Sequence, residues 1–409
     1  MEALEEQPFP FLKILPVCLL FRIVDFIVSD PMDLGRLDLV FYKYLHQEWR
    51  SDILPHLNRS FLQMFFGVKL RWALTRNVPI KCMGVSDDPF WLDCVEYLTS
   101  EKNRSIFQIG FLHTQPEIYG DLVTRLRKSA HGMLVSVEKL DFQSTEETPF
   151  YRTGQLHPVR ELIEVIQRCP KLTNLAIVGL ADDSLVINLC GCTELAHVYL
   201  PSCDGRMTEW SHGVTGYGLK ALANSPVGNR LLSLNISRMK ELDNIALLEI
   251  SACCHQLRHL DISNNNHRDL HYGFTMIASH CLHLQRLDLS FCFWLTGETF
   301  VFLRGKQLLT ELEGLLLYGC ANVDCNILPL FCELFPRLDL LDISHWDFGR
   351  FCGDDLDASN LLDAFLGNEN SLHNPRRLFE LHMTDEFFCH IEFLQMKRDF
   401  PNVNIIVGI

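Results

Sequence analysis

The chain has 409 residues, of which 48% are hydrophobic and 21% charged, and its formal net charge at pH 7 is −15. A chain of this length and composition can bury a large core. The acidic balance argues against a nucleic-acid-binding surface, which needs clustered Lys and Arg side chains. The most apolar stretch, residues 14–28, contains Arg22 and Asp25 and is too short to span a bilayer. We therefore expect neither nucleic acid nor a membrane among the partners.

The cysteines and the first residues predict a compartment. The 16 cysteines are widely spread, and several recur with the repeat described below, so we expect reduced thiols rather than disulfides. The segment Met1–Glu6 is acidic rather than basic, which is not typical of a secretory signal. These features predict a cytoplasmic and/or nuclear protein.

The first predicted elements are short amphipathic helices within residues 11–60. Pro16 suits the first turn of a helix, where its missing N–H is not needed. Apolar residues then follow at helical spacing, at Leu19, Leu20, Ile23, Phe26 and Ile27. Asp33 can cap a second helix, whose apolar stripe is Leu34, Leu37 and Val40. This pattern predicts a separate helical module.

This segment resembles an F-box, the motif by which substrate receptors attach to the Skp adaptor of cullin-based ubiquitin ligases. The chain departs from the family pattern at Phe41 and Tyr44, where the family has Cys and Trp, and in the length of the loop between the first two helices. The resemblance implies that the adaptor would be contacted by Leu15, Pro16, Leu19, Leu20, Ile23, Leu34, Leu37 and Val40.

Two alternatives to the F-box remain open. Residues 11–60 can instead cap the first repeat of the domain that follows. The segment also partly resembles the box by which another class of leucine-rich-repeat receptors binds Elongin C. Ile14 and Cys18 fit that box, but Arg22 stands where an aliphatic residue is expected.

Residues 61–103 are rich in aromatic side chains, including Phe61 and Trp72. A helix over residues 61–74, followed by a turn at Val78-Pro79, would hide the apolar edge of the first repeat. We therefore predict a linker and N-terminal cap here, with an aromatic ligand pocket as the alternative.

From residue 104 onward the chain repeats one sequence motif, here called the phrase, in which three apolar residues are separated first by two variable residues and then by one. The sharpest copies are Cys192–Cys203 and Cys281–Cys292. Ten copies end at Thr114, Thr145, Leu180, Cys203, Met239, Asn265, Cys292, Cys320, Trp346 and Glu386. Alternation such as Leu287-Asp288-Leu289 predicts a short strand with one buried face, and helical spacing follows each strand. One strand and one helix cannot bury their own apolar faces, so we expect the repeats to stack.

The phrases resemble the leucine-rich repeat family, and those that end in Cys resemble its cysteine-containing subclass. The resemblance implies an α/β solenoid, or horseshoe, over residues 104–409, preceded by the helical module. It also implies that the closing Asn or Cys points inward and bonds the backbone of the adjoining turn. Cys203, Asn265, Cys292 and Cys320 hold that position, whereas Leu180, Met239, Trp346 and Glu386 depart from it.

Binding residues are expected on the concave face, which the strands form, and at the strand exits, which are the positions just after each strand ends. In register on that face are Tyr199, Asn235, Asp261, Asp288, Leu316 and Asp342, with Phe291, Tyr318, His345 and Trp346 beside them. Exposed aromatic residues are common anchors of protein interfaces. We predict that Tyr199, Asp261, Asp288, Phe291, Tyr318, Asp342, His345 and Trp346 contact a protein substrate. Plain solubility for the Asp residues, and an inward Trp346 that replaces the missing Cys, are the alternatives.

No catalytic or cofactor site is predicted. Cys253-Cys254-His255 and Cys389-His390 lack the second ligand pair that structural zinc requires. The run Gly213–Gly218 has no following Lys-Ser/Thr, so we expect a loop rather than a nucleotide-binding turn. We also expect an acidic insertion near residues 348–377 and a last strand near residues 403–407 that closes the sheet edge.

The sequence thus predicts a non-catalytic substrate receptor of a cullin-RING ubiquitin ligase. The N-terminal helices would hold a Skp-type adaptor and cullin, and the repeats would hold a substrate of unknown identity near the partners that transfer ubiquitin. The alternatives are a leucine-rich-repeat scaffold without a ligase and an Elongin C-linked receptor.

Overall fold

A computed structural model describes residues 37–38, 80–85, 108–114, 127, 134, 137–144, 159–179, 181–202, 213–266, 269–306, 308–324, 327–346, 380–384 and 404–408. The chain divides into two compact units, residues 1–177 and 178–409.

The first unit contains parallel strands that pair in chain order. They are β1 (Leu37–Asp38), β2 (Ile80–Val85), β3 (Gln108–Thr114) and β4 (Lys139–Ser144). Helix α7 (Val159–Ile166) buries Val159, Leu162, Val165 and Ile166, and it leads to β5 (Asn174–Val178). The N–H groups of Thr173 and Asn174 both donate to the Glu138 carbonyl, at 2.8 and 3.0 Å. The strand–helix–strand repeat is therefore established in this unit.

Strand β1 corrects one sequence prediction. Leu37 was expected on the second amphipathic helix, but Leu37 and Asp38 pair with Ile80 and Cys82 of β2. Because Leu37-Asp38-Leu39 alternates with a period of two, this short run fits a strand as well as a helix. Neither β1 nor β2 was predicted. Seven of the predicted adaptor contacts, Leu15, Pro16, Leu19, Leu20, Ile23, Leu34 and Val40, lie outside the described residues, as does the predicted cap helix over residues 61–74.

The second unit continues with one strand per repeat. The strands are β6 (His197–Tyr199), β7 (Ser233–Asn235), β8 (His259–Asp261), β9 (Arg286–Asp288), β10 (Gly314–Leu316), β11 (Leu340–Asp342), β12 (Glu380–Thr384) and β13 (Asn404–Gly408). The helices are α8 (Asp183–Leu189), α9 (Gly216–Ala223), α10 (Asn244–Cys253), α11 (His271–His280), α12 (Gly297–Val301) and α13 (Leu328–Leu334), with a 3-10 helix, η4, at Gly228–Arg230.

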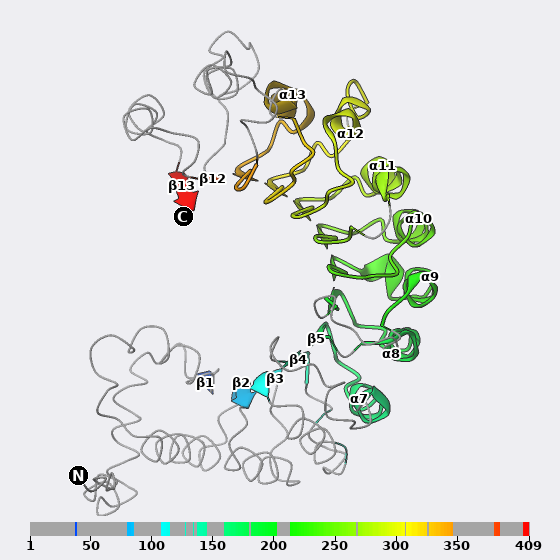
Figure 1. The fold of residues 1–409 in the computed structure, drawn as a ribbon. Coiled ribbons are helices and arrows are strands. Elements are labelled where there is room, and N and C mark those ends of the chain that lie inside the picture. The colour runs from blue at the N-terminus through cyan, green and yellow to red at the C-terminus, as the bar shows by residue number, and fades with distance from the viewer. Residues whose placement is uncertain are drawn as a thin grey trace, which may run out of the picture. The chain divides into compact units, whose positions relative to one another are not determined.

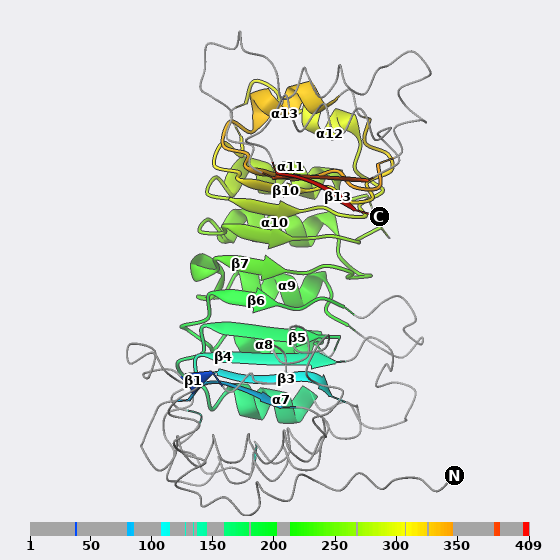
Figure 2. The same ribbon diagram turned by 90° about the vertical axis from the view of Figure 1, so that its left-hand side faces the viewer.

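The strands of this unit pair in chain order into a parallel sheet. The helices of the unit all lie along one face of this sheet (Figure 1). Each of the ten predicted phrases contains a strand, from β3 to β12. Seen from the strand side, the strands stack edge to edge (Figure 2). The last predicted strand is confirmed as β13, which pairs with β12. The predicted acidic insertion, residues 348–377, lies outside the described residues.

The core lies between the strand layer and the helix layer. In one phrase Leu284, Leu287 and Leu289 are at most 1% exposed. The helices contribute large rings, and those of Phe300 and Phe331 meet edge to face at 4.9 Å between centroids. Burial of this kind contributes roughly 25 cal/mol per Å² of apolar surface. Neighbouring strands pair and neighbouring helices such as α9, α10 and α11 pack against one another, so the repeats share one core.

The residues that close the phrases point inward, as predicted. Asn265 donates to the carbonyls of Ile236 and Ile262 at 3.0 and 2.9 Å, and it accepts from the Met239 N–H at 2.6 Å. Cys292 and Cys320 occupy the same place. Their thiols donate one repeat back, to the carbonyls of Ile262 (3.4 Å) and Leu289 (3.1 Å). These bonds satisfy backbone groups that the tight turns leave without a strand partner. Cys203 lies outside the described residues.

Helix starts in this unit are set by side-chain caps. Asp182 and Asp243 cap α8 and α10 by accepting from backbone N–H groups, and Thr215 caps α9. The run Gly213–Gly218 was expected to be a loop, but its second half opens α9. A Cβ on Gly218 would lie 2.4 Å from an Asp183 carboxylate oxygen, so glycine permits this close approach.

The described cysteines are free thiols. Burial raises the pKa of Cys254, Cys281 and Cys320 to about 12, which makes these thiols inert at neutral pH. None of the helices in the part of the chain that the structure describes is long and apolar enough to cross a membrane. The architecture is an α/β leucine-rich-repeat solenoid.

Candidate interaction surface at the strand exits

The third residue of each strand β6 to β11 belongs to one in-register column. The pairing links Tyr199, Asn235, Asp261, Asp288, Leu316 and Asp342 in that order, and it continues to His382 and Ile406. The predicted register is therefore confirmed. Along the column Tyr199 is 42% exposed, whereas Asn235 is only 8% exposed. The intervening Asp side chains are half-buried.

The column carboxylates have a structural task that the sequence did not reveal. Each of Asp261, Asp288 and Asp342 accepts, at 2.9 Å, from the backbone N–H of the serine two residues later. Asn235 does the same for Ser237 at 3.0 Å, and its side-chain amide also donates to Asp261. These Asx turns fold the chain back after the strand. The carboxylates of Asp288 and Asp342 therefore hold the turns that carry Phe291 and His345.

Burial also affects the protonation of these carboxylates. Desolvation raises the pKa of Asp261 above its ordinary value. Burial, together with the nearby charges of Asp261 and Asp342, raises the pKa of Asp288 to about 6. The Asp342 carboxylate lies 4.0 Å from Nδ1 of His382. The column is thus a half-buried anionic strip, and a cation placed on it would lower these pKa values.

The residue three positions after each column residue, from Asn235 to Asp342, adopts a left-handed backbone conformation. This position holds Arg238, Asn264, Phe291, Gly319 and His345, with φ values between 55° and 66°. Asn and Gly tolerate this conformation, but a bulky aromatic residue there is unusual. Phe291 has φ of 55° and is 40% exposed. A strained and exposed aromatic residue is typical of positions kept for binding rather than for stability.

The rings at three successive exits form an aromatic row, Phe291, Tyr318 and His345. The Phe291 and Tyr318 centroids are 4.9 Å apart at 71°, and those of Tyr318 and His345 are 4.7 Å apart at 63°. Both pairs have the edge-to-face geometry that aromatic rings favour. Phe291 also packs over Gly319, where a Cβ would lie 2.6 Å from the ring. The row is therefore ordered before any partner binds.

Two residues that support this row were not predicted from the sequence. Gly319 is needed for its φ of 66° and for the space that the Phe291 ring occupies. Asn266 donates to the Phe291 carbonyl and accepts from the Phe293 N–H at 2.7 Å. Phe293 is itself 48% exposed, so one amide holds two exposed aromatic residues in place. The only signal in the sequence was the run of Asn residues after β8.

Trp346 does not belong to this surface. It is 3% exposed, and its indole Nε1 donates to the Leu317 carbonyl at 2.8 Å. The indole thus takes the place that Cys292 and Cys320 take in the preceding repeats. Its prediction as a substrate contact is corrected, because the indole fills the inward position of the missing Cys and adds a second hydrogen bond to a carbonyl that already accepts from the Cys320 N–H.

The arrangement is suited to binding a protein. The aromatic row offers apolar area at low entropic cost, and the adjacent carboxylates attract Lys or Arg side chains. Among the described residues, no group of three or more His, Cys, Asp or Glu side chains converges to hold a metal ion.

No family model matches the chain. A search of curated proteins also finds no match. Among solved structures, the chain is similar to one from the Rad7 and Elc1 complex in yeast, at 13% identity and a TM-score of 0.44, over 80% of this chain and 74% of the other. It is also similar to an internalin, InlF, from Listeria monocytogenes, at 12% identity and a TM-score of 0.36, over 83% of this chain and 78% of the other. Both TM-scores are below 0.5, so the fold follows from the repeat geometry above and not from these likenesses.

Proposed function

We propose that this chain is a substrate receptor of a cullin-RING ubiquitin ligase, acting in the cytoplasm and/or nucleus. Its N-terminal segment binds a Skp-type adaptor, and the strand exits of its repeats bind a protein substrate. The chain is not itself catalytic. Partners transfer ubiquitin, and the receptor contributes by holding substrate lysines near them, which raises their effective concentration.

The observation that carries the binding half of the proposal is the aromatic row. Phe291 is exposed despite a backbone conformation that costs a bulky residue about 1 to 2 kcal/mol. Nothing in the fold requires a ring there, because Asn264 and Gly319 fill the equivalent position in the adjoining repeats. Exposed aromatic side chains with few rotatable bonds are frequent hot spots of protein interfaces. The anionic strip beside the row favours a substrate segment that carries Lys or Arg.

The adaptor half is supported by the sequence alone. Leu15-Pro16, Leu19-Leu20 and Ile23 have the spacing of the F-box pattern. Leu37, which that pattern would place on a helix, lies in strand β1 instead. This pairing favours a second candidate function, in which the N-terminal segment extends the repeat sheet and the chain is a leucine-rich-repeat scaffold without a ligase. Attachment through Elongin C is a variant of the first function.

The two candidates differ in adaptor binding. The purified chain is titrated with the Skp adaptor and, separately, with Elongin C by isothermal calorimetry. A receptor binds one of them, and Leu19→Ala/Leu20→Ala/Ile23→Ala abolishes binding while the circular dichroism spectrum is retained. Phe291→Asn is the matched control, because it alters the substrate surface and should leave adaptor binding unchanged. If neither adaptor binds, the ligase function is excluded and the scaffold function stands.

A further inference from the structure

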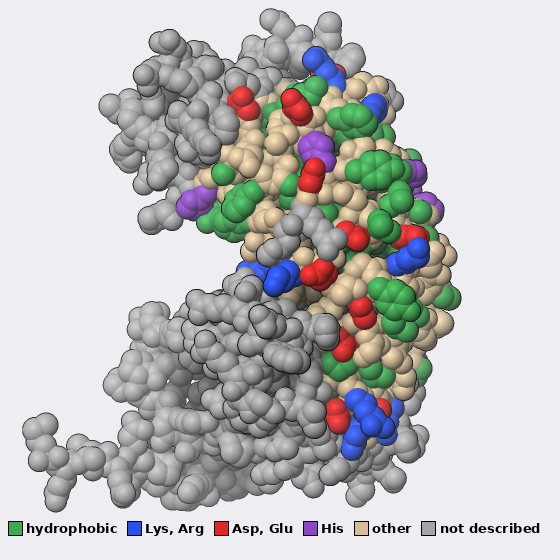
Figure 3. All heavy atoms as spheres, turned by 45° about the vertical axis from the view of Figure 1, so that its right-hand side comes forward, with side chains coloured by type: hydrophobic (Ala, Val, Ile, Leu, Met, Phe, Trp, Pro, Cys, Tyr) green, Lys and Arg blue, Asp and Glu red, His purple; other side chains and the backbone are tan. Residues whose placement is uncertain are grey.

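Charged side chains of both signs are interspersed over the described part of the face that Figure 3 shows. Several of them neutralise each other. Lys220 pairs with Glu249 at 2.7 Å, and Arg304 pairs with Glu333 at 3.1 Å. A partner is therefore selected by charged side chains that have no such pair, and not by a broad field of one sign.

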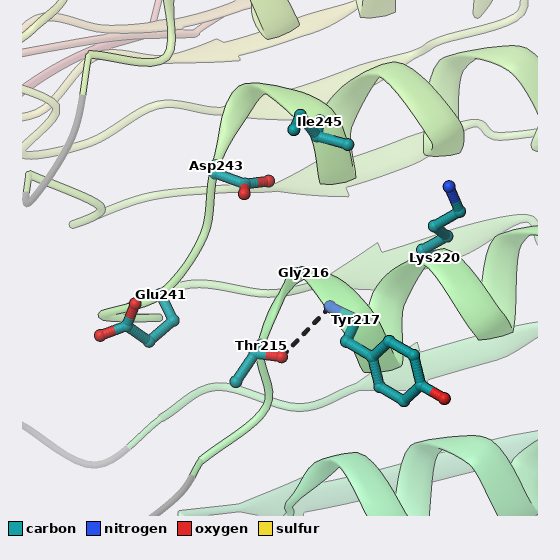
Figure 4. Close-up of a pocket in the computed structure, with 7 residues that line it drawn as sticks. All are labelled: Thr215, Gly216, Tyr217, Lys220, Glu241, Asp243 and Ile245. Atoms are coloured by element: carbon teal, nitrogen blue, oxygen red, sulfur yellow. Dashed lines mark hydrogen bonds between the residues drawn. The ribbon is translucent and has the colours of Figure 1, made fainter.

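The pocket between the starts of α9 and α10, of about 280 Å³, is lined by polar side chains that serve the helices (Figure 4). Thr215 caps α9 by accepting from the Tyr217 N–H at 3.1 Å. Asp243 caps α10 by accepting from the Ala246 N–H at 2.8 Å. The ammonium of Lys220 is held in the ion pair described above. Unpaired charges lie instead on the strand side.

Two unpaired cations, Arg258 and Arg286, lie where strands β8 and β9 begin. Both side chains are exposed, and neither makes a hydrogen bond or an ion pair within the described ranges. The stem of Arg286 lies against Gly314, its neighbour on β10, where a Cβ would be 3.4 Å from Arg286 Cγ. The guanidinium is therefore directed toward β10. It makes no ion pair with Asp288, although both residues face the same side of β9, with the buried Leu287 between them.

The imidazole of His259 reports a positive potential at these strand entries. Burial lowers the pKa of His259 from its ordinary value. The nearby cations lower this pKa further, and they are Arg286, His197 and Arg258. Glu313, at the entry of β10, acts in the opposite direction. The positive charge is therefore confined to the entries of β8 and β9.

The exits of the same two strands carry the opposite charge. Asp261 and Asp288 are the third residues of these strands, and they face the same side as the first residues. About 7 Å therefore separates a cationic column from an anionic one. The Asp288 carboxylate makes no ion pair in the described part of the chain. Burial and the neighbouring carboxylates raise its pKa to about 6, because no cation offsets them. Strands β8 and β9 thus present a dipolar face.

We propose that the substrate segment bound at the strand exits is bipolar, with an acidic residue against Arg286 and, two residues away, a Lys or Arg against Asp288. In an extended segment two such side chains lie on one side, about 7 Å apart, which matches the two columns. The apolar residue that contacts Phe291 lies beyond the basic one. This substrate class rests on the binding role proposed for the aromatic row, and it does not depend on attachment to a ligase.

The probe is a phage-displayed library of random 12-residue peptides, selected on the full wild-type chain after depletion on Phe291→Asn. This depletion directs the selection to the aromatic row. Expected winners carry an acidic residue and, two positions away, a Lys or Arg, with an aromatic or aliphatic residue beyond the basic one. As synthetic peptides they should bind Arg286→Glu about ten-fold more weakly than the wild type in fluorescence anisotropy. Because Arg286 is exposed and unpaired, this variant should keep its fold, which circular dichroism checks.

Charge exchange makes the outcome decisive. Replacing the acidic residue of a winner by Lys should restore its binding to Arg286→Glu. Asp288→Asn can still accept from the Ser290 N–H, and it should weaken the winners about five-fold. The same peptides with Gln in place of Lys or Arg should not respond to Asp288→Asn. Lys171→Glu, which reverses another exposed cation, in the first unit, should change nothing.

Two results would overturn the proposal, and they differ in what they leave standing. Winners that need Phe291 but lack the two charges and tolerate Arg286→Glu would keep the aromatic row as a binding site and remove the bipolar substrate. If no peptide distinguishes the wild type from Phe291→Asn, the binding role of the aromatic row fails, and the bipolar substrate fails with it.

Discussion

Asn265 links neighbouring repeats through its buried side chain, so its replacement should destabilise the protein. Its side chain is 2% exposed and makes three bonds, to the Ile236 and Ile262 carbonyls and from the Met239 N–H. In Asn265→Ala the Ile262 carbonyl keeps its hydrogen bond from the Cys292 thiol. The Ile236 carbonyl and the Met239 N–H lose the hydrogen bond that Asn265 makes with each of them. Each unsatisfied buried group costs about 1 to 3 kcal/mol, so we expect a loss of about 3 kcal/mol in the free energy of unfolding.

Urea unfolding followed by circular dichroism measures this loss. Asn265→Cys places at this position the residue that neighbouring repeats use, and its thiol can still donate to one carbonyl, so we expect about half the loss. Asn322→Ala is the matched control, because that amide is exposed and makes one described bond, to the Phe293 carbonyl. If Asn265→Ala costs no more than Asn322→Ala, the inward amide does not stabilise the stacked turns and the reasoning is refuted.

Three further predictions test neighbouring features. Phe291→Asn relieves the strain of a left-handed backbone but loses ring packing, and each effect is worth about 1 kcal/mol. We therefore expect the free energy of unfolding, measured in urea, to change by less than about 1 kcal/mol, while substrate capture falls at least ten-fold. A large loss of stability would instead make Phe291 a structural residue. Trp346→Ala should lower the free energy of unfolding by about 3 to 5 kcal/mol, and a loss below about 1 kcal/mol would show that the indole is not part of the core. Burial raises the pKa of Asp288 to about 6 from an ordinary 3.8, so as the pH falls the folded state binds this proton at a higher pH than the unfolded state does. The free energy of unfolding should therefore rise by roughly 2 kcal/mol between pH 7 and pH 4. Asp288→Asn, which can still accept from the Ser290 N–H, should remove that contribution in urea melts across this range, and an unchanged pH slope would contradict the shift.

The repeats could be predicted because their signal is local and recurs. Leu287-Asp288-Leu289 alternates within one strand, and the same phrase returns after 27 residues on average across Asn265, Cys292, Cys320 and Trp346. Apolar residues with a period of two predict a strand, and the helical spacing that follows predicts a helix. The inward direction of the closing Cys and Asn followed from the family resemblance, and the hydrogen bonds confirm it.

Elements outside this pattern were harder to predict. Leu37 lies on a short apolar run that suits either element, and its pairing with Ile80 depends on a segment distant in sequence. The glycines of Gly216–Ala223 suggested a loop, but Thr215 caps that segment and its glycines give room to Asp183 and Asp243. In both cases tertiary contacts override local propensity.

The residues of the candidate site that share one column of the sheet were predicted, but the hydrogen bonds that they make were not. The register of Asp261 and Asp288 followed from counting, whereas their role in the Asx turns depends on the backbone path after the strand. The strain at Phe291 is likewise a backbone property that no residue pattern encodes.

The central claim is that one chain holds an adaptor and a substrate through separate residues. Its most direct test is quantitative mass spectrometry of the proteins recovered with the wild type, with Phe291→Asn and with Leu19→Ala/Leu20→Ala/Ile23→Ala, each expressed at equal level in the same cells. We predict that Phe291→Asn loses a set of substrate proteins and keeps the adaptor and cullin, whereas the triple variant loses the adaptor and cullin and keeps the substrates. If both variants lose the same proteins, or if no adaptor is recovered with the wild type, the two-site receptor is contradicted.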